Sequence, residues 1–356
     1  MDKKVTLYYG GFLGGSGGAF MHSRSMKSVL ENHGWLVDVV TLDNLPIYVR
    51  YLPHILSHLA NWLFPPVGYF YKGRLTRFLY RLYFDDQVSL RIFEDIYISW
   101  NSSTPSVTIL HAVWSDNLQS MTVSEEQKSK LIDLEAKVIN AIQHPVVTVS
   151  SPYWDYLISE QFSKHSLRKI DVIPLGINVA DFDVLNDRER DNKSIVYCGS
   201  LEARKNVYFL LQVFKRLYLF DKGYKLTLIG GGPDAQVLQG FCADNKLPVT
   251  FLGRLAHDRV REELRRHHIY LHTSLKESFS FALLEAKLSG LVTCAYSGLE
   301  VPREFIDIPV HAFDVDEWFQ AIISDRPACS CEFDRNKYSA IAMASDTLKL
   351  VNCSLV

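Results

Sequence analysis

Residues 269–295 read IYLHTSLKESFSFALLEAKLSGLVTCA, and this stretch decides the class of fold. It begins with a short apolar run at 269–273 and ends with another at 292–295, both rich in residues that favour strands. Between them, 281–289 has the apolar spacing of a helix that buries one face. A strand, a helix and a strand in this order predict a βαβ unit, in which the two strands are parallel.

The same alternation extends over the whole second half of the chain. Further strands are predicted at 195–198, 225–229 and 249–252, and further helices at 207–219, before Asn245 and at 260–267. We therefore expect a Rossmann-like domain with a parallel sheet at 173–335. The last segment, 336–356, carries one more helical pattern and is expected to pack back toward the first domain.

The first half predicts a second domain of the same kind at 1–172. A strand at 5–9, a loop with six glycines between Gly10 and Gly18, a helix ending near Gly34 and a strand at 37–42 form a βαβ unit. Strands at 107–111 and 146–150 extend its sheet. The predicted fold class is α/β, with two Rossmann-like doubly wound parallel sheets facing a cleft. That cleft is the expected active site, because open parallel sheets bind ligands beyond the carboxyl ends of their strands.

Residues 46–84 interrupt the first domain with a largely helical insertion that is basic and aromatic. The insertion contains Arg50, Lys72, Arg74, Arg77 and Arg81 and no acidic residue. Such a composition suits contact with an anionic membrane surface, where aromatic rings enter the interface and cations meet headgroups. The alternative is a pair of helices packed on the sheet with a solvated basic face.

Composition excludes several other classes. A net charge of −2 argues against a nucleic-acid partner, which would favour a basic protein. The six cysteines have neither disulfide-framework nor metal-site spacing, so reduced thiols in the cytoplasm are expected. The N-terminal apolar run is too short for a signal peptide, and no uncharged apolar segment is long enough to span a membrane.

Two carboxylates of the opening stretch, Glu277 and Glu285, flank a predicted strand-to-helix turn. Free backbone N–H groups and the positive end of the helix dipole at such a turn can hold an anion or sugar hydroxyls. Ionised carboxylates accept hydrogen bonds from paired hydroxyls. A glutamate in a first helical turn is also common for the dipole alone, so the pair does not decide the function by itself.

Together with four further segments, this motif resembles the retaining glycosyltransferases of family four, whose architecture is the B-type glycosyltransferase (GT-B) fold. The resemblance covers about half of the chain closely, and its specificity comes from the order of the motifs. The segments that carry it are Val172–Asn178 with Phe182, Val196–Leu201 followed by Arg204-Lys205-Asn206, Leu226–Pro233, Val249–Arg254 and Glu277–Gly290.

The resemblance implies a role for each matching residue. Glu285 would grip the ribose hydroxyls of a nucleotide, and Glu277 would face the transferred sugar. Lys205, helped by Arg204, would meet the diphosphate, where fixed cations stabilise the leaving group. His111, at the end of the strand 108–110, resembles the family's cleft histidine, although a lone histidine is as often structural. The predicted catalytic residues are His111, Glu277, Lys205 and Arg204, with Asp116 as a lesser candidate.

Donor binding is assigned to backbone and side chains around the same turns. The glycine loop of the first half would let the backbone approach the diphosphate, and Gly14 and Gly15 are its predicted donor-binding residues. Ser278 and Ser280 stand where the family often has glycine, and Ser200 where it often has arginine, which puts the identical contacts in doubt. The predicted donor-binding residues are Gly14, Gly15, Gly199, Ser200, Arg204, Lys205, Arg254, Ser278, Phe279, Ser280, Phe281 and Glu285.

No metal and no separate cofactor are expected beyond the nucleotide diphosphate sugar that serves as donor. Asp314-Val315-Asp316 imitates an Asp-x-Asp metal motif but lies near a helix start, so we interpret it as capping and surface charge. The predicted function is retaining transfer of a hexosyl group, from a UDP-sugar ahead of a GDP-sugar, to a glycan or lipid-linked acceptor. The predicted setting is bacterial surface polysaccharide or lipopolysaccharide synthesis, at the inner face of the cell membrane.

Two alternatives stay open. The glycine-rich βαβ start, with Asp43 after its second strand, would suit an NAD-dependent Rossmann oxidoreductase, although the loop lacks a clear G-x-G-x-x-G fingerprint. The departures at Ser200, Ser278 and Ser280 would suit a catalytically weakened glycosyltransferase-like protein that acts as a binding component.

Overall fold

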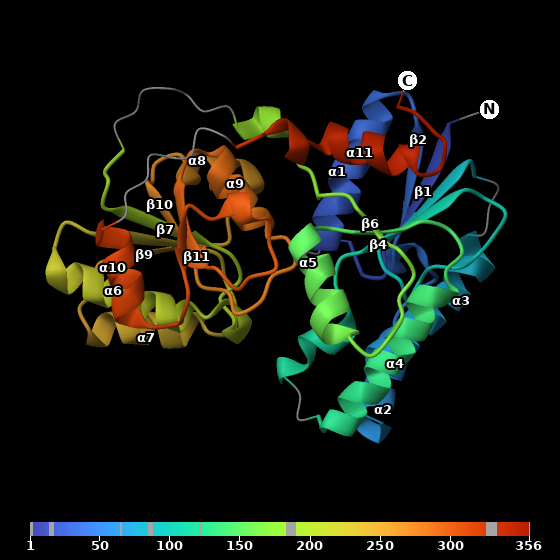
Figure 1. The fold of residues 1–356 in the computed structure, drawn as a ribbon, viewed down its shortest axis with the longest axis horizontal. Coiled ribbons are helices and arrows are strands. Elements are labelled where there is room, and N and C mark those ends of the chain that lie inside the picture. The colour runs from blue at the N-terminus through green and yellow to red at the C-terminus, as the bar shows by residue number, and fades with distance from the viewer. Residues whose placement is uncertain are drawn as a thin grey trace. The chain divides into compact units, whose positions relative to one another are not determined.

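The computed structural model describes residues 3–13, 18–64, 66–84, 88–120, 123–182, 190–324 and 333–355. The chain divides into two compact units (Figure 1). Unit 1 comprises Met1–Asn178 with Asn336–Val356, and unit 2 comprises Val179–Arg335. Residues 173–178 thus pack with unit 1 rather than beginning the second domain, because Ile177 forms a parallel bridge with Ser339.

Unit 1 is a parallel sheet with helices on its faces. Its six strands lie in the order β2-β1-β3-β4-β5-β6, and every pair is parallel. The strands are β1 Lys4–Tyr8, β2 Leu36–Val40, β3 Leu90–Phe93, β4 Ser106–Leu110, β5 Val146–Thr148 and β6 Asp171–Val172. The helices are α1 Gly18–Asn32, α2 Leu52–Leu63, α3 Gly68–Phe84, α4 Glu125–Ala141, α5 Ser151–Tyr156 and α11 Ala340–Lys349.

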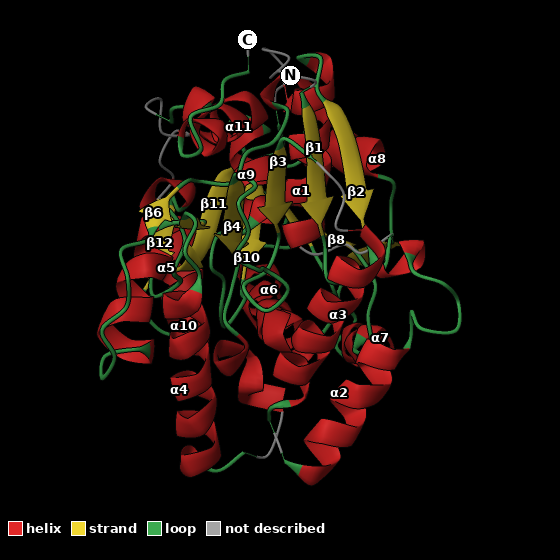
Figure 2. Ribbon diagram, turned by 90° about the vertical axis from the view of Figure 1, so that its right-hand side faces the viewer, coloured by secondary structure: helices red, strands yellow, loops and turns green. Residues whose placement is uncertain are grey.

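Unit 2 repeats this plan with its own sheet. Its strand order is β12-β11-β10-β7-β8-β9, again parallel throughout. The strands are β7 Ser194–Cys198, β8 Lys225–Ile229, β9 Val249–Gly253, β10 Ile269–His272, β11 Val292–Tyr296 and β12 Ile308–Val310. The helices are α6 Val207–Phe220, α7 Ala235–Asp244, α8 His257–Leu264, α9 Phe281–Leu288 and α10 Val315–Ser324. The predicted fold class is confirmed (Figure 2).

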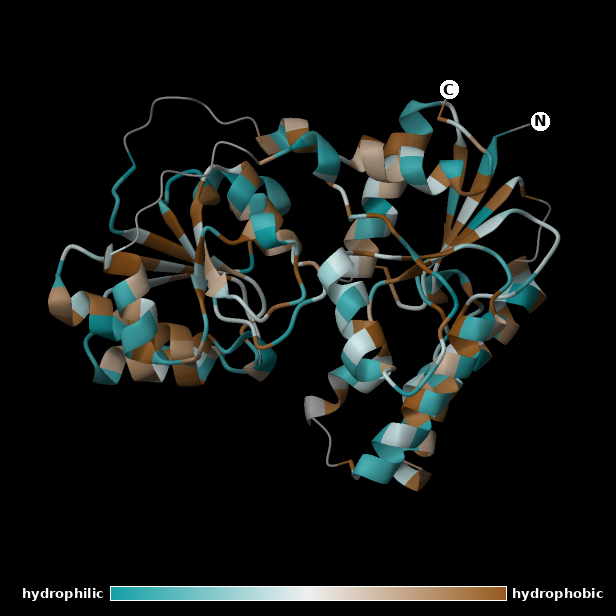
Figure 3. Ribbon diagram, viewed as in Figure 1, coloured by the Kyte–Doolittle hydropathy of each residue, from teal (hydrophilic) through white to brown (hydrophobic). Residues whose placement is uncertain are grey.

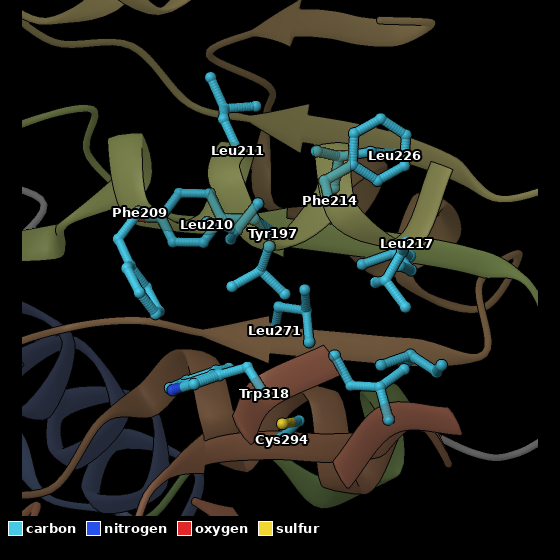
Figure 4. Close-up of a cluster of buried hydrophobic side chains, with 14 of the residues drawn as sticks. Tyr197, Phe209, Leu210, Leu211, Phe214, Leu217, Leu226, Leu271, Cys294 and Trp318 are labelled. Carbon is cyan, nitrogen blue, oxygen red and sulfur yellow. The ribbon is translucent and has the colours of Figure 1, made fainter. Parts of the chain in front are cut away.

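The central strands are apolar because helices cover both faces of a parallel sheet. All residues of β4 and β10 are buried, and Figure 3 colours the strands of both sheets largely hydrophobic. In unit 2, Leu210 and Phe214 of α6 pack with strand residues and with Trp318 of α10 in one cluster (Figure 4). This core holds the strand ends, and therefore the loops that follow them, in fixed positions.

Both sheets contain a point at which the strand order reverses. In unit 1 the chain runs outward from β1 to β2 on one side and continues from β3 to β6 on the other. In unit 2 the corresponding neighbours are β7 and β10. Open parallel sheets bind ligands beyond the carboxyl ends of the strands at such a point.

The insertion 46–84 forms the helices α2 and α3, which pack on each other, and this confirms its predicted helical character. Its apolar side chains are only partly buried. More than half of the large hydrophobic side chains exposed among the described residues belong to it, including Trp62 at 80%, Tyr48 at 73% and Phe64 at 67% exposure. No helix in the described part of the chain combines the length and apolarity needed to cross a bilayer.

Gly230 allows a close approach between the loops that follow β7 and β8. Its φ is +136°, and a Cβ added there would lie 1.8 Å from the carbonyl oxygen of Gly199. We expect Gly230→Ala to reduce the free energy of unfolding by at least about 2 kcal/mol, through backbone strain and the clash. Urea denaturation of the protein, followed by the fluorescence of unit 2, measures the change in the free energy of unfolding.

Gly240 supplies the matched control because it lies inside α7 with no atom within 4 Å of an added Cβ. Gly240→Ala should raise stability by up to about 1 kcal/mol, since alanine favours helix. Equal effects of the two substitutions would contradict the assigned close approach.

Candidate active site

The two loops at the switch point of unit 2 carry most of the predicted site residues. The β7–α6 loop holds Arg204 and Lys205, and the β10–α9 loop holds Glu277. Two hydrogen bonds join the loops: the backbone Leu275 N donates to Arg204 O at 3.0 Å, and the side-chain Thr273 Oγ1 donates to Lys205 O at 3.0 Å. The loops therefore form one rigid rim at the carboxyl ends of adjacent strands.

Each loop turns into its helix through a left-handed residue. Asn206 precedes α6 with φ 51°, and Ser280 precedes α9 with φ 68°. Asparagine tolerates this conformation, whereas it is uncommon for serine, and Ser280 also caps the helix by accepting a hydrogen bond from Leu283 N at 3.4 Å. These turns point the first amides of both helices toward the rim.

Glu277 lies at the centre of a charged cluster. Its carboxylate contacts Lys205 Nζ directly, His272 Nε2 at 3.4 Å and Arg204 Nη1 at 3.8 Å. Burial acts to raise the pKa of Glu277, but the charge of Lys205 and the hydrogen bond from His272 outweigh it, and the pKa lies well below its usual range. The carboxylate is therefore ionised at neutral pH, with the cations of Lys205 and Arg204 beside it.

Glu285 occupies a different environment inside α9. It is buried, with His257 Nε2 at 3.3 Å as its ion-pair partner. Burial raises the pKa of Glu285, while His257 and Arg261 act in the opposite direction. Glu285 and Glu277 are thus held by separate partners, although both act electrostatically on Tyr270 in β10, the strand that precedes them.

The glycine-rich turns bring backbone close to the rim. A Cβ at Gly232 would lie 2.2 Å from Leu201 O, and one at Gly199 would lie 2.7 Å from the Tyr197 hydroxyl. Ser200 Oγ donates to Glu202 Oε1 at 2.8 Å, so this side chain is engaged within its own loop. Arg254 lies against Gly231.

The segment Ser278–Phe281 contributes mainly backbone. Phe279 is 2% exposed and contacts the rings of Phe281 and Phe305, with centroids 5.5 and 5.3 Å apart. Its ring therefore belongs to the core. Ser278 and Phe281 are partly buried at the start of α9.

In unit 1, His111 pairs with the carboxylate of Glu94, a residue that was not predicted from the sequence. His111 Nε2 lies 2.9 Å from Glu94 Oε2. Asp116 accepts hydrogen bonds from the hydroxyls of Tyr153 at 3.1 Å and Tyr156 at 2.7 Å, which indicates a structural role. Gly14 and Gly15 lie outside the described residues. Asp43 accepts from Leu13 N at 2.5 Å, at the edge of the same loop.

Four polar residues of these sites were missed. His272 ends β10 as His111 follows β4, so the strand-end argument used for His111 would have found it. Its Nδ1 is buried without a hydrogen-bond partner among the described residues. His257, His22 and Glu94 carry no motif signal, because only the fold brings them to their partners. Asp314, by contrast, caps α10 by accepting from Glu317 N at 2.8 Å, as predicted.

The family model for "Glycosyl transferases group 1" matches residues 182–315. The chain has the GT-B fold, and its residues 182–315, named here the group 1 domain, are similar to the group 1 glycosyltransferases. The group 1 domain contains both loops of the rim, from Gly199 to Lys205 and from Lys276 to Ser280. The predicted resemblance to family four glycosyltransferases is confirmed at this level.

Curated relatives match over part of their length, and they are named as subunits of phosphatidylinositol N-acetylglucosaminyltransferase. The chain is 29% identical over 189 residues to the relative from Arabidopsis thaliana, which covers 51% of this chain and 42% of that protein. The human relative is 32% identical over 124 residues, 34% of this chain and 26% of that protein. The matched segments thus span less than half of either relative.

Solved structures match over nearly the whole chain and share its GT-B fold. Sucrose-phosphate synthase from Thermosynechococcus elongatus has a TM-score of 0.70 at 18% identity, covering 98% of this chain and 95% of that one. The lipopolysaccharide outer core galactosyltransferase WaaB has a TM-score of 0.61 at 15% identity, covering 98% of this chain and 99% of that one. Anabaena HepE in complex with UDP and glucose has a TM-score of 0.57 at 16% identity, covering 100% of this chain and 96% of that one.

The low pKa of Glu277 makes part of the stability of the group 1 domain dependent on pH. Its folded pKa lies below the ordinary 4.5, so ionised Glu277 stabilises the fold above about pH 4.5, and this contribution is lost as pH falls toward the folded pKa. We expect Glu277→Gln to lower the melting temperature at pH 7, and the deficit to shrink between pH 5 and pH 3, as differential scanning fluorimetry would measure.

Glu135 provides a control of opposite sign. Burial raises its pKa from 4.5 to about 7, so its contribution declines as pH rises between these values. A Glu277→Gln deficit that stayed constant down to pH 3 would show that the carboxylate is not held in its charged form.

Proposed function

We propose that this chain is a retaining hexosyltransferase that uses a nucleotide diphosphate sugar as donor and a glycan or lipid-linked acceptor. The observation that carries the proposal is the contact between Lys205 and Glu277 across the switch point of the group 1 domain, with Arg204 and His272 beside it. The two cations can bind the diphosphate of such a donor. The carboxylate beside them can accept hydrogen bonds from the hydroxyls of its sugar.

The cations have a defined task in this reaction. The bond between the sugar's anomeric carbon and the diphosphate oxygen breaks, and negative charge grows on the leaving phosphate. Lys205 and Arg204 stabilise that charge more strongly in the transition state than in the bound donor. Their partner Glu277 holds Lys205 in place beforehand, so no reorganisation is needed when the charge develops.

The acceptor's hydroxyl oxygen forms the new bond to the anomeric carbon on the face that the diphosphate leaves. Attack on this face retains the stereochemistry at the anomeric carbon. The proton of the hydroxyl passes to a phosphate oxygen of the leaving group, so the reaction needs no dedicated base. Glu285 would accept the ribose hydroxyls and Glu277 those of the sugar. The amides of Ser278, Phe279, Ser280 and Phe281 at the start of α9, with Gly199, Ser200 and Arg254, complete the donor site.

A UDP-sugar is the donor we favour over a GDP-sugar. The solved structure of HepE, which shares the fold, holds UDP and glucose. The relatives named for phosphatidylinositol N-acetylglucosaminyltransferase support an acceptor that carries a lipid. We place the reaction at the cytoplasmic face of a membrane, in surface-glycan assembly. Transfer activity would also separate this proposal from a weakened, binding-only protein.

Replacing Lys205 tests the proposal directly. With a panel of UDP-, GDP-, ADP- and dTDP-sugars, we expect turnover of a UDP-sugar by the wild type. Lys205→Ala should lower kcat about 100-fold or more, because it removes a charge aimed at the leaving group. Product release measured by nucleotide detection gives the rate.

Two variants make the result specific. Lys205→Arg keeps the cation beside Glu277 and should retain much more activity than alanine. Lys225→Ala removes a lysine whose side chain is 71% exposed on the same domain and should leave the rate unchanged. Wild-type rates in Lys205→Ala, or no turnover and no binding of any nucleotide sugar by the wild type, would refute the proposed function.

The helices α2 and α3 are the proposed membrane contact. Their exposed apolar side chains, Trp62 and Phe64 among them, lie within a segment whose charged residues are all basic. Apolar area together with Lys and Arg is the combination that binds anionic bilayers. The same surface would hold a lipid-linked acceptor near the enzyme.

Liposome flotation tests this contact. We expect binding to vesicles with phosphatidylserine, weaker binding to neutral vesicles, and release by salt. Replacing exposed Arg74 and Arg81 with serine should weaken binding by about 2 kcal/mol, roughly 30-fold, at about 1 kcal/mol per cation. Leu219→Ser with Val237→Ser, at 61% and 65% exposed positions of unit 2, is the control. Wild-type protein that floats with neither vesicle would rule out the contact.

A further inference from the structure

The switch point of unit 1 holds a second buried cluster, formed by His22, Glu94 and His111. Glu94 directly follows β3, and its backbone N donates to Tyr8 O in β1 at 3.0 Å. His22 lies on α1, which follows β1, and His111 follows β4. Three neighbouring strands of the sheet therefore bring these side chains together, although they are far apart in sequence.

The carboxylate of Glu94 is the centre of the cluster. It lies 2.8 Å from His22 Nδ1, 2.9 Å from His111 Nε2 and 2.7 Å from Ser23 Oγ, which donates to it. The side chain of Glu94 has no exposed area. Burial alone would raise the pKa of Glu94, but the charge of His22 and the hydrogen bonds from both histidines bring it to about 2. The group is a buried carboxylate with three donors.

An ionised carboxylate fixes the protons of its neighbours because it can only accept hydrogen bonds. The ring nitrogens that face it, Nδ1 of His22 and Nε2 of His111, must therefore carry hydrogen. Burial lowers the pKa of His111, against the opposing effect of Glu94, so the ring is neutral at pH 7 and holds a single proton. With that proton on Nε2, the other nitrogen of His111 has a free lone pair.

His111 and Glu94 line a cavity of about 200 Å³ in unit 1. Tyr69, Tyr97 and Trp114 form other parts of its wall, and Asp95 adds a second carboxyl group. Tyr69 OH and Tyr97 N both donate to Asp95, each at 3.0 Å. Aromatic faces with a few hydrogen-bonding groups suit a ring that bears hydroxyls. Since Nε2 of His111 is directed to Glu94, Nδ1 is the nitrogen left for such a ligand.

We propose that Glu94 is a positioning residue, which with His22 holds His111 in the tautomer that accepts a hydrogen bond at Nδ1 from a hydroxyl of a sugar-like ligand. The identity of the ligand rests on the proposed function, whereas the tautomer does not. Glu94 acts through His111 and has no contact with the reacting atoms. A hydroxyl that donates to Nδ1 keeps its oxygen lone pairs free.

A metal ion is the competing occupant. The three ligand atoms of His22, Glu94 and His111 lie within 4.8 Å of one another, and two imidazoles with a carboxylate can bind a transition metal. The bond from Ser23 and the short distances to both rings favour the hydrogen-bonded arrangement. The two arrangements require opposite protonation: a metal would need lone pairs on Nδ1 of His22 and Nε2 of His111.

Long-range ¹H–¹⁵N spectra of protein labelled at histidine nitrogen distinguish these cases, with His111 assigned by loss of its signals in His111→Phe. We expect the Nε2–H tautomer of His111 in the wild type, purified with and without chelator. Nδ1–H on His111, or a spectrum that changes on chelation or on addition of Zn²⁺ alone, would overturn the proposal. The wild-type spectrum decides this, and His111→Phe serves only to assign its signals.

Glu94→Gln then tests the cause. Glutamine keeps one acceptor oxygen, replaces the other with an NH₂ donor and carries no charge, so part of His111 should change to the Nδ1–H tautomer. Asp133→Asn is the matched control, because Asp133 pairs with His165 Nε2 at 2.8 Å on the surface of the same unit. It should leave the His111 signals unchanged. An unaltered His111 tautomer in folded Glu94→Gln would contradict the positioning role.

Transfer kinetics supply a separate arm. Glu94→Gln should reduce kcat/KM at least about tenfold, the effect of one lost hydrogen bond, and Glu94→Asp should restore part of it. Unchanged kinetics in a variant whose tautomer has switched would overturn the ligand contact. If the wild type transfers no sugar, the proposed function fails while the spectra still decide the role of Glu94.

Discussion

The contact between Lys205 and Glu277 depends on the reversal of strand order between β7 and β10, and the rest of the site is arranged around it. Adjacent parallel strands end at the same edge of a sheet, so their loops meet there. The ionised carboxylate fixes the lysine. The charges of Lys205 and Arg204 in turn keep the carboxylate ionised, against the effect of its burial. Removal of either partner would leave a charge partly desolvated, which is costly.

In unit 1, loops also meet at the point where the strand order reverses, but the side chains that they bring together are different. Its switch point also holds a buried carboxylate, Glu94, but the partners are two histidines and a serine instead of lysine and arginine. The pKa of both Glu94 and Glu277 lies below its ordinary value because donors outweigh burial. Glu285 and Asp95 have raised pKa values because burial prevails there. One sheet end thus presents fixed cations, and the other a neutral imidazole.

The exposed apolar surface of α2 and α3 has a separate physical origin. These helices pack on each other and on the rest of unit 1 through residues such as Phe70, Leu79 and Tyr80, while Trp62 and Phe64 remain in solvent. Exposed apolar side chains concentrated in one segment indicate a surface that contacts something other than water. Because residues 46–84 contain basic but no acidic residues, we expect the surface that they contact to be negatively charged.

The sequence by itself determined the α/β class, because continuous apolar runs such as 195–198 and their spacing from helical patterns are local properties. It also placed Lys205 and Glu277 on strand-to-helix turns. It missed β3, whose four residues Leu90–Phe93 include an arginine, and with it Glu94. Lys205 and Glu277 are 72 residues apart, and His22 and Glu94 are equally distant, so only strand order could decide that they touch. Burial and partner charge, which set each pKa, exist only once the sheets have formed.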